Sequence, residues 1–177
     1  RLVHNTLVGL GIRQHIRLGA SGKIVSAFDM ARVMAMGADW CNSARGFMFA
    51  LGCIQAQACH TGHCPTGVTT QDPIRQQALV VPDKAQRVAN FHHETLVSLM
   101  DMVGAAGLDH PQEITSDHIL RRVDANTIAP LSALLPSITA GVLSPQAATP
   151  DLDTAAWPPV FRNFWHRASP ETFKLQA

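Results

Sequence analysis

The sequence predicts an α/β protein made of strand–loop–helix units whose strands run parallel. Residues 16–20 and 38–41 each have the character of a short strand, and each is followed by a loop of small residues and a helical pattern. Short links between a strand, a helix and the next strand are typical of parallel βα folds. Two units are too few to close a barrel, and Arg1 already lies in a helical pattern, so we expect further units upstream.

The first helical pattern covers residues 2–15 and is interrupted at Gly9 and Gly11. Glycine is unfavourable inside a helix, so we expect the helix to end near these residues. The strand at residues 16–20 then leads into the short loop formed by residues 21–23.

A capped helix is predicted next. Ser26 is a favoured N-cap residue, and Asp29 three positions later makes a variant of the capping box. Gly37 is suited to the position just after the end of this helix. We expect its buried face to contain Phe28, Ala31 and Ala35, which recur at helical spacing.

The second strand, residues 38–41, leads through a loop at residues 42–46 to an apolar helix that starts at residues 47–51. A longer amphipathic helix is predicted from Pro82 to about Val103. Its apolar stripe contains Val88, Phe91, Thr95, Leu99 and Met102, and Gly104 and Gly107 are expected to stop it.

Another short helix is predicted to reach Arg122, with its N-terminal cap formed by Thr115, Ser116 and Asp117. Beyond that point the composition changes, because seven prolines fall in the last 54 residues. We interpret this segment as an irregular tail that wraps on a partner surface. The predicted organisation is therefore the last βα units with a cysteine loop at 1–80, a helical extension at 81–123 and a proline-rich tail at 124–177.

Composition excludes several classes of protein. Of the 177 residues, 46% are hydrophobic and 15% charged, which suits a globular domain and argues against disorder. A net charge of +1 gives no indication of a nucleic acid or a membrane surface as a partner, and no apolar run is long enough to span a bilayer. The chain has four cysteines and no recognisable secretory signal, which predicts a reducing, cytoplasmic location and a metal or redox site.

Three of the cysteines follow the pattern Cys53-x5-Cys59-x4-Cys64, with Pro65 directly after the last. Thiolates gathered on one loop favour an iron–sulfur cluster, and three ligands suit a three-iron cluster. Zinc is an alternative because two histidines, at 60 and 63, lie between the cysteines, although structural zinc sites favour closer cysteine pairs. Inert or disulfide-bonded cysteines are a third possibility. Cys41, within a predicted strand, is expected to pack as a small apolar side chain.

Two loops have the composition of a phosphate site, since each follows a strand and precedes a helix. Backbone N–H groups at such positions bind phosphate in many barrels, and the cations of Lys23 and Arg45 would add to the attraction. Glycine in βα turns is also common for purely steric reasons. The candidate residues are Ala20, Ser21, Gly22 and Lys23 in the first loop, and Ser43, Ala44, Arg45 and Gly46 in the second.

The segments LGASGK (18–23), ADWCNSARG (38–46) and ALGC through CHTGHCPTGVTTQDP (50–73) together resemble the FMN-binding domain of glutamate synthases. The resemblance covers about residues 10–110. It implies that the chain is the C-terminal portion of a (β/α)8 TIM barrel, with an iron–sulfur loop and a helical extension. It also implies that Cys53, Cys59 and Cys64 bind a [3Fe-4S] cluster, and that the eight loop residues contact the phosphate side of FMN.

The activity implied by this resemblance is the reduction of an imine of 2-oxoglutarate to L-glutamate. The nitrogen would come from glutamine or ammonia, and the electrons from a donor such as ferredoxin or NAD(P)H. The segment LVVPDKA (79–85) resembles the shorter, stand-alone members of the family. The oxo-acid pocket is expected on earlier βα units. The alternatives are a non-catalytic module stapled by zinc or a cluster, and another oxidoreductase of the FMN-barrel type.

Overall fold

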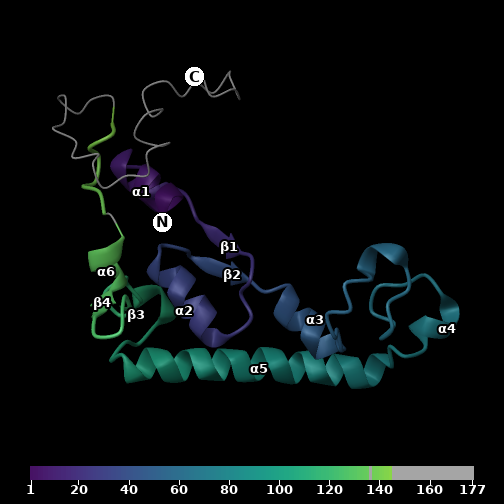
Figure 1. Cartoon of the computed structure of the whole chain (residues 1–177). Helices are drawn as coiled ribbons and strands as arrows, with labels where there is room; N and C mark the ends of the chain where they lie inside the picture. Colours follow the sequence, from purple (N-terminus) through teal and green to yellow (C-terminus); the bar gives the residue numbers. More distant parts are fainter. Residues whose placement is uncertain (136, 145–177) are drawn as a thin grey trace, which may run out of the picture. The chain divides into compact units, whose positions relative to one another are not determined.

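The computed structural model describes residues 1–135 and 137–144 (Figure 1). The described chain forms two compact units, one made of residues 1–16 with residues from 132 onward, and the other of residues 17–131. The helices are α1 (Leu2–Gly9), α2 (Ala27–Ala35), α3 (Arg45–Leu51), α4 (Pro73–Gln76), α5 (Val81–Ala105) and α6 (Leu131–Leu134). The strands are β1 (Gly19–Ser21), β2 (Trp40–Asn42), β3 (Leu120–Arg122) and β4 (Ile128–Pro130), and three 3-10 turns lie at Arg13–His15, Cys59–Thr61 and Pro111–Glu113.

The parallel βα prediction is confirmed by the pairing of β1 with β2. The two strands run parallel, with Gly19 opposite Trp40 and Ser21 opposite Asn42. Both strands are shorter than expected, with three residues each. Just before the ladder begins, the Asp39 carboxylate accepts a hydrogen bond from the backbone N–H of Leu18 at 2.6 Å. Within the described residues each sheet has two strands, so the class is α/β and no closed barrel is formed.

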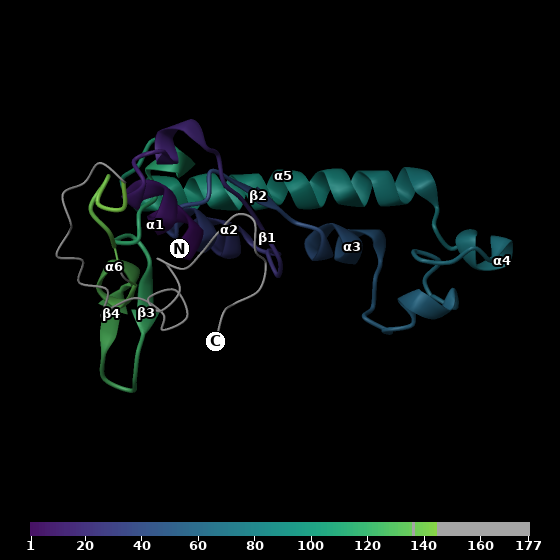
Figure 2. The same ribbon diagram turned by 90° about the horizontal axis from the view of Figure 1, so that it is seen from above.

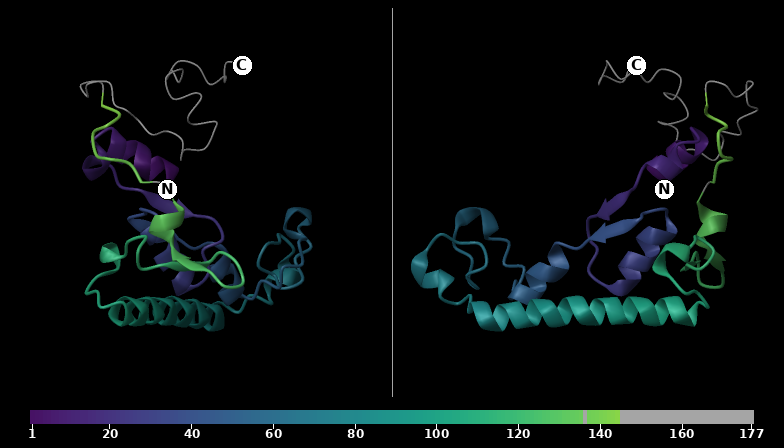
Figure 3. Two further views of the ribbon diagram at one scale, coloured as in Figure 1. Left: turned by 60° about the vertical axis from the view of Figure 1, so that its left-hand side comes forward. Right: turned by 180° about the vertical axis from the view of Figure 1, so that it is seen from behind.

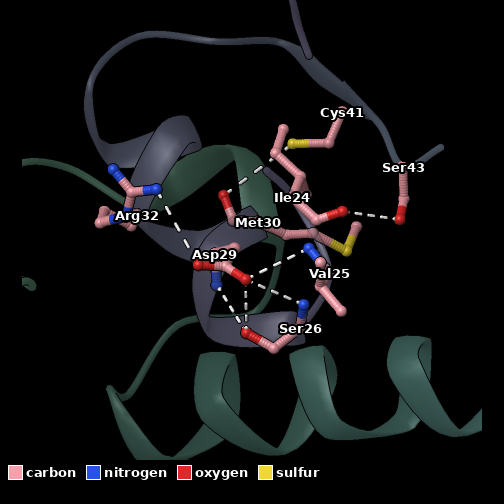
Figure 4. Close-up of polar contacts among 8 residues, drawn as sticks. All are labelled: Ile24, Val25, Ser26, Asp29, Met30, Arg32, Cys41 and Ser43. Carbon is pink, nitrogen blue, oxygen red and sulfur yellow. Dashed lines mark hydrogen bonds and ion pairs between the residues drawn. The ribbon is translucent and has the colours of Figure 1, made fainter. Parts of the chain in front are cut away.

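The cap of α2 forms as predicted. The Ser26 hydroxyl accepts a hydrogen bond from the backbone N–H of Asp29, and the Asp29 carboxylate accepts one from the backbone N–H of Ser26 at 3.0 Å (Figure 4). Gly37, with φ of 106°, follows the end of the helix. The expected buried face needs one correction: Ala27 takes the place of Phe28, which is 51% exposed. The helix therefore meets its neighbours through alanines, which allow a close approach.

Helix α5 is the longest element, with 25 residues, and α2 and α3 both pack along it (Figures 1 and 2). The residues of the predicted stripe are half-buried apart from Leu99, which is buried, as is Val103 one turn further along. Phe91 meets Phe47 of α3 edge-on, with ring centroids 5.3 Å apart. Gly107 ends the helix in a left-handed conformation, whereas Gly104 is still inside it.

The prediction of a short helix that reaches Arg122 was wrong. Residues Leu120–Arg122 instead form β3, which pairs antiparallel with β4 (Figure 3). The turn between the two strands is held by the Asp124 carboxylate, which accepts hydrogen bonds from the backbone N–H groups of Asn126 and Thr127. The start of the expected irregular tail is therefore regular, with a strand and the helix α6. Residues 136 and 145–177 of that tail lie outside the described residues.

The first unit contains α1 and the segment from residue 137 to 144. The helix ends at Gly9 as predicted, and Gly11 follows it with φ of 71°. The Val8 carbonyl accepts a hydrogen bond from the N–H of Gly141, and the Gly9 carbonyl accepts one from the N–H of Leu143 at 2.7 Å. A side chain at position 9 would overlap the Leu143 side chain, so glycine here permits this pairing. None of the described helices is both long enough and apolar enough to cross a bilayer.

Candidate cofactor site

The two predicted phosphate loops lie together at one edge of the parallel sheet. In a parallel pair the carboxyl ends of the strands meet at the same edge, and here β1 ends at Ser21 opposite Asn42, the last residue of β2. The Ser43 hydroxyl donates a hydrogen bond to the Ile24 carbonyl at 2.7 Å, which ties the second loop to the first (Figure 4). The structure thus brings the two sets of candidate residues into one region.

The first loop is open to solvent. Ser21, Gly22 and Lys23 are exposed, whereas Ala20 is half-buried in β1. Gly22 and Lys23 both have positive φ, at 96° and 56°. A side chain at position 22 would meet no atom within 4 Å, so the backbone conformation and not a lack of space calls for glycine.

The second loop is shorter than expected, because Arg45 and Gly46 already belong to the first turn of α3, after Ala44 at its N-cap. Gly46 is buried. A Cβ atom at this position would lie 2.7 Å from both Phe91 Cζ and Ser43 Oγ, so packing against α5 accounts for this glycine. Ala44 and Arg45 are exposed and border a cavity of about 340 Å³.

The cysteine loop connects α3 with α4 (Figure 1). Cys53 follows Gly52, the left-handed C-cap of α3, and Cys59 starts a 3-10 turn. Cys53, Cys59 and Cys64 all line one small cavity of about 20 Å³. Cys53 and Cys59 also border the 340 Å³ cavity that contains Arg45, so the cysteine loop and the second βα loop share a wall. All three cysteines are free thiols, as is Cys41.

Cys64 has the most perturbed thiol. Its Sγ lies 3.4 Å from the Thr66 hydroxyl. This hydroxyl and the backbone N–H groups of Thr69 and Thr66 lower the pKa of Cys64 to about 6. The thiolate is the form that binds metals, so this environment prepares Cys64 as a ligand. Cys41 is the opposite case, because burial raises the pKa of its thiol, and its Sγ lies 3.9 Å from the Met30 carbonyl (Figure 4).

The arrangement does not match a site for a single ion. Among the described residues, no three His, Cys, Asp or Glu side chains stand close enough together to hold one metal ion. His60 and His63 are exposed and line neither cavity. The three ligands of a three-iron cluster bind different irons, so they surround a hollow and need not meet at one point. Three thiols on one cavity, with hydroxyl and N–H donors beside one sulfur, have the donor chemistry of such a group. The cavity of about 20 Å³ has room for about one water, so it would have to widen to hold a cluster.

Sequence reasoning missed four further residues of this region. Gln55 and Gln57 have positive φ, at 58° and 56°, and both border the larger cavity. Glutamine has no preference for this conformation, so no sequence signal pointed to them. Thr66 and Thr69 line the small cavity, and the available signal was their place within five residues of Cys64.

Two joined βα loops beside a cysteine-lined cavity define a candidate cofactor-binding α/β protein. The sequence profile of a family described as the conserved region in glutamate synthase matches residues 1–109, which include every candidate residue. The chain therefore belongs to the glutamate synthase family, as the sequence motifs indicated.

Several curated relatives agree with this assignment. The chain is 37% identical over 134 residues to the glutamate synthase large subunit-like protein YerD of Bacillus subtilis (strain 168), covering 76% of this chain and 26% of that protein. It is 34% identical over 108 residues to ferredoxin-dependent glutamate synthase 2 of Synechocystis, covering 60% of this chain and 7% of that protein. An archaeal glutamate synthase [NADPH] of Methanocaldococcus jannaschii is 35% identical over 99 residues, covering 56% and 19%. The chain thus spans about a quarter of the first relative and less of the others.

Proposed function

We propose that this chain is part of a glutamate synthase-type oxidoreductase in which residues 17–80 contribute to binding FMN and a [3Fe-4S] cluster. One observation carries the proposal: Cys53, Cys59 and Cys64 line one cavity, and two of them share a second cavity with Arg45 from the neighbouring βα loop. The family assignment supports an oxidoreductase role. The three thiolates would hold the cluster, with Cys64 already favoured in its charged form.

The flavin phosphate would lie at the carboxyl edge of β1 and β2. Lys23 and Arg45 are exposed there and would offset the phosphate charge, while backbone N–H groups of the two loops would donate hydrogen bonds. The open space at Gly22 leaves room for a ligand to approach the backbone. The full set proposed to contact FMN is Ala20, Ser21, Gly22, Lys23, Ser43, Ala44, Arg45 and Gly46, with Gly46 limited to its backbone.

We place β1 and β2 as the last two strands of a (β/α)8 barrel. Two-stranded sheets leave backbone groups unpaired at both edges, and neighbouring barrel strands would satisfy them. Trp40 on β2 and Phe28 on α2 are 48% and 51% exposed, so further units would also bury apolar surface here. The same units would supply the 2-oxoglutarate pocket.

When bound, the cluster and the flavin supply the electrons that convert an imine of 2-oxoglutarate to L-glutamate. The residues of this chain bind and position these groups. The nitrogen would come from glutamine or ammonia. Relatives are named for ferredoxin, NADH or NADPH, and we propose an electron donor of one of these kinds. We also propose a cytoplasmic location.

Metal and sulfide analysis tests the cluster. Protein purified without oxygen should contain about three irons per chain and labile sulfide, and the oxidised form should give the spin-half electron paramagnetic resonance signal of a three-iron centre. Serine substitution of Cys53, Cys59 or Cys64 should lose iron. The matched control is Cys41→Ser, because this thiol lies in β2 and borders neither cavity.

A zinc-stapled module without catalysis is the alternative. Its expected composition is one zinc, no iron and no flavin, and that result would refute the proposal.

Charge reversal tests the flavin site. Arg45→Glu and Lys23→Glu should each reduce flavin occupancy, because a carboxylate there repels the phosphate. Arg87→Glu makes the same charge change on the exposed side of α5 and should leave occupancy unchanged. Full flavin occupancy in both loop variants would place the phosphate elsewhere.

A further inference from the structure

Two threonine hydroxyls lie beside the cysteine cavity in addition to its thiols. Thr66 Oγ1 is 3.4 Å from Cys64 Sγ. Thr69 Oγ1 is buried and makes no hydrogen bond of ordinary geometry among the described residues, but it interacts with the Cys64 thiol. Both residues line the cavity that Cys53, Cys59 and Cys64 share.

Other hydroxyls of the same loop are fully used within it. The Thr61 hydroxyl donates to the Ala58 carbonyl at 2.8 Å and accepts from the backbone N–H of His63. The Thr70 hydroxyl donates to the Gly62 carbonyl and accepts from the backbone N–H of Asp72. These bonds hold the loop in shape, whereas the hydroxyls at 66 and 69 do not contribute in this way.

An unpaired buried hydroxyl is costly. Leaving such a group without a partner costs about 1–3 kcal/mol, so a native structure retains it where something accepts its hydrogen bond. The lining of the cavity combines apolar side chains with three thiols, and the Thr69 hydroxyl interacts with one of these thiols, Cys64. The acceptor for this hydroxyl is therefore the Cys64 sulfur, which is one of the proposed cluster ligands.

We propose that Thr66 and Thr69 donate hydrogen bonds to the sulfurs of the iron–sulfur cluster and thereby raise its reduction potential. Both hydroxyls would donate to Cys64 Sγ. The inference rests on the proposed function. Reduction takes one electron from the external donor, breaks no bond and increases the negative charge on sulfur. A hydrogen-bond donor therefore stabilises the reduced cluster more than the oxidised one.

The test is a redox titration of the cluster-containing protein, followed by loss of the spin-half signal. Thr66→Val and Thr69→Val keep the side-chain shape without the hydroxyl, and each should move the midpoint potential to a more negative value. A tenfold fall in the ratio of reduced to oxidised cluster at a fixed potential corresponds to about 59 mV for one electron. Thr66→Ser and Thr69→Ser should restore the potential, and Thr95→Val, which removes a hydroxyl of α5 outside both cavities, should not change it.

Unchanged potentials in both valine variants, with iron content intact, would overturn the inference and leave the proposed function standing. A measurement on the unmodified protein covers the case in which valine prevents cluster insertion. Pulsed electron–nuclear double resonance, compared in H2O and D2O, should detect exchangeable protons coupled to the cluster. Thr66→Ser and Thr69→Ser should retain the same number of these protons. Absence of such protons would also overturn the inference. Protein that binds no iron at all would refute the proposed function and this inference together.

Discussion

Adding one methyl group at Gly46 should destabilise the protein, although alanine favours helices. The new Cβ would lie 2.7 Å from Phe91 Cζ, roughly 1 Å closer than carbon atoms normally approach, and it would also lie 2.7 Å from Ser43 Oγ. The Phe91 ring cannot withdraw without losing its edge-on contact with Phe47. Overpacking of this kind costs about 1–3 kcal/mol, against a gain of up to about 1 kcal/mol in helix propensity. We expect Gly46→Ala to lose about 1 kcal/mol of unfolding free energy.

The assay is urea unfolding followed by circular dichroism, with linear extrapolation to water. Gly104→Ala is the matched control, because Gly104 lies inside α5 and a Cβ there meets nothing within 4 Å. This control should gain stability, by at most about 1 kcal/mol. Phe91→Leu should remove most of the penalty of Gly46→Ala, so the double-mutant cycle should show a favourable coupling energy. Equal stabilisation by alanine at 46 and at 104 would refute the packing argument.

The capping box and the cysteine loop provide further tests. Ser26→Ala should cost about 1 kcal/mol of unfolding free energy in a urea titration, because it removes the N-cap of α2. The pKa of Asp29 is lowered, first by the backbone N–H of Ser26, so its stabilising effect exists above the unfolded pKa and disappears as pH falls through the folded pKa. Asp29→Asn should therefore destabilise at neutral pH and have little effect in acid, and an equal loss at both would contradict this. Gly67→Ala should abolish iron binding, since the new Cβ collides with the Arg75 carbonyl at a residue with φ of 75°. Gly62→Ala has a similar φ of 74° but open space, so it should cost only about 1–2 kcal/mol and retain iron.

Local patterns explain which parts of the fold were predictable. The capping box of α2, the end of α1 at Gly9 and the apolar stripe of α5 depend on residues within a few positions of one another. The β3–β4 hairpin was missed because it depends on pairing between residues as far apart as Leu120 and Pro130. Phe28 fits the helical period but is exposed, since the period alone does not say which side chain is small enough to face a neighbour.

The candidate site divides in the same way. The cysteine spacing and the two small-residue loops can be seen in the sequence, and they sufficed to indicate the glutamate synthase family. The sequence does not show why position 46 is a glycine, because its close approach to Phe91 joins residues that are 45 positions apart. The same is true of the second cavity, where Arg45 and Cys59 come from different elements.

The sequence by itself determined the βα order, the capping box of α2 and the cysteine motif, because each is encoded by neighbouring residues and their hydrogen-bonding and steric preferences. Only the tertiary structure decided the register in which β1 and β2 pair, that the three cysteines line one cavity and that the Thr69 hydroxyl is buried beside it. These features arise when distant segments exclude water from one another. A polar group or a glycine that is buried in this way affects the stability of the fold to an extent that its position in the sequence does not reveal.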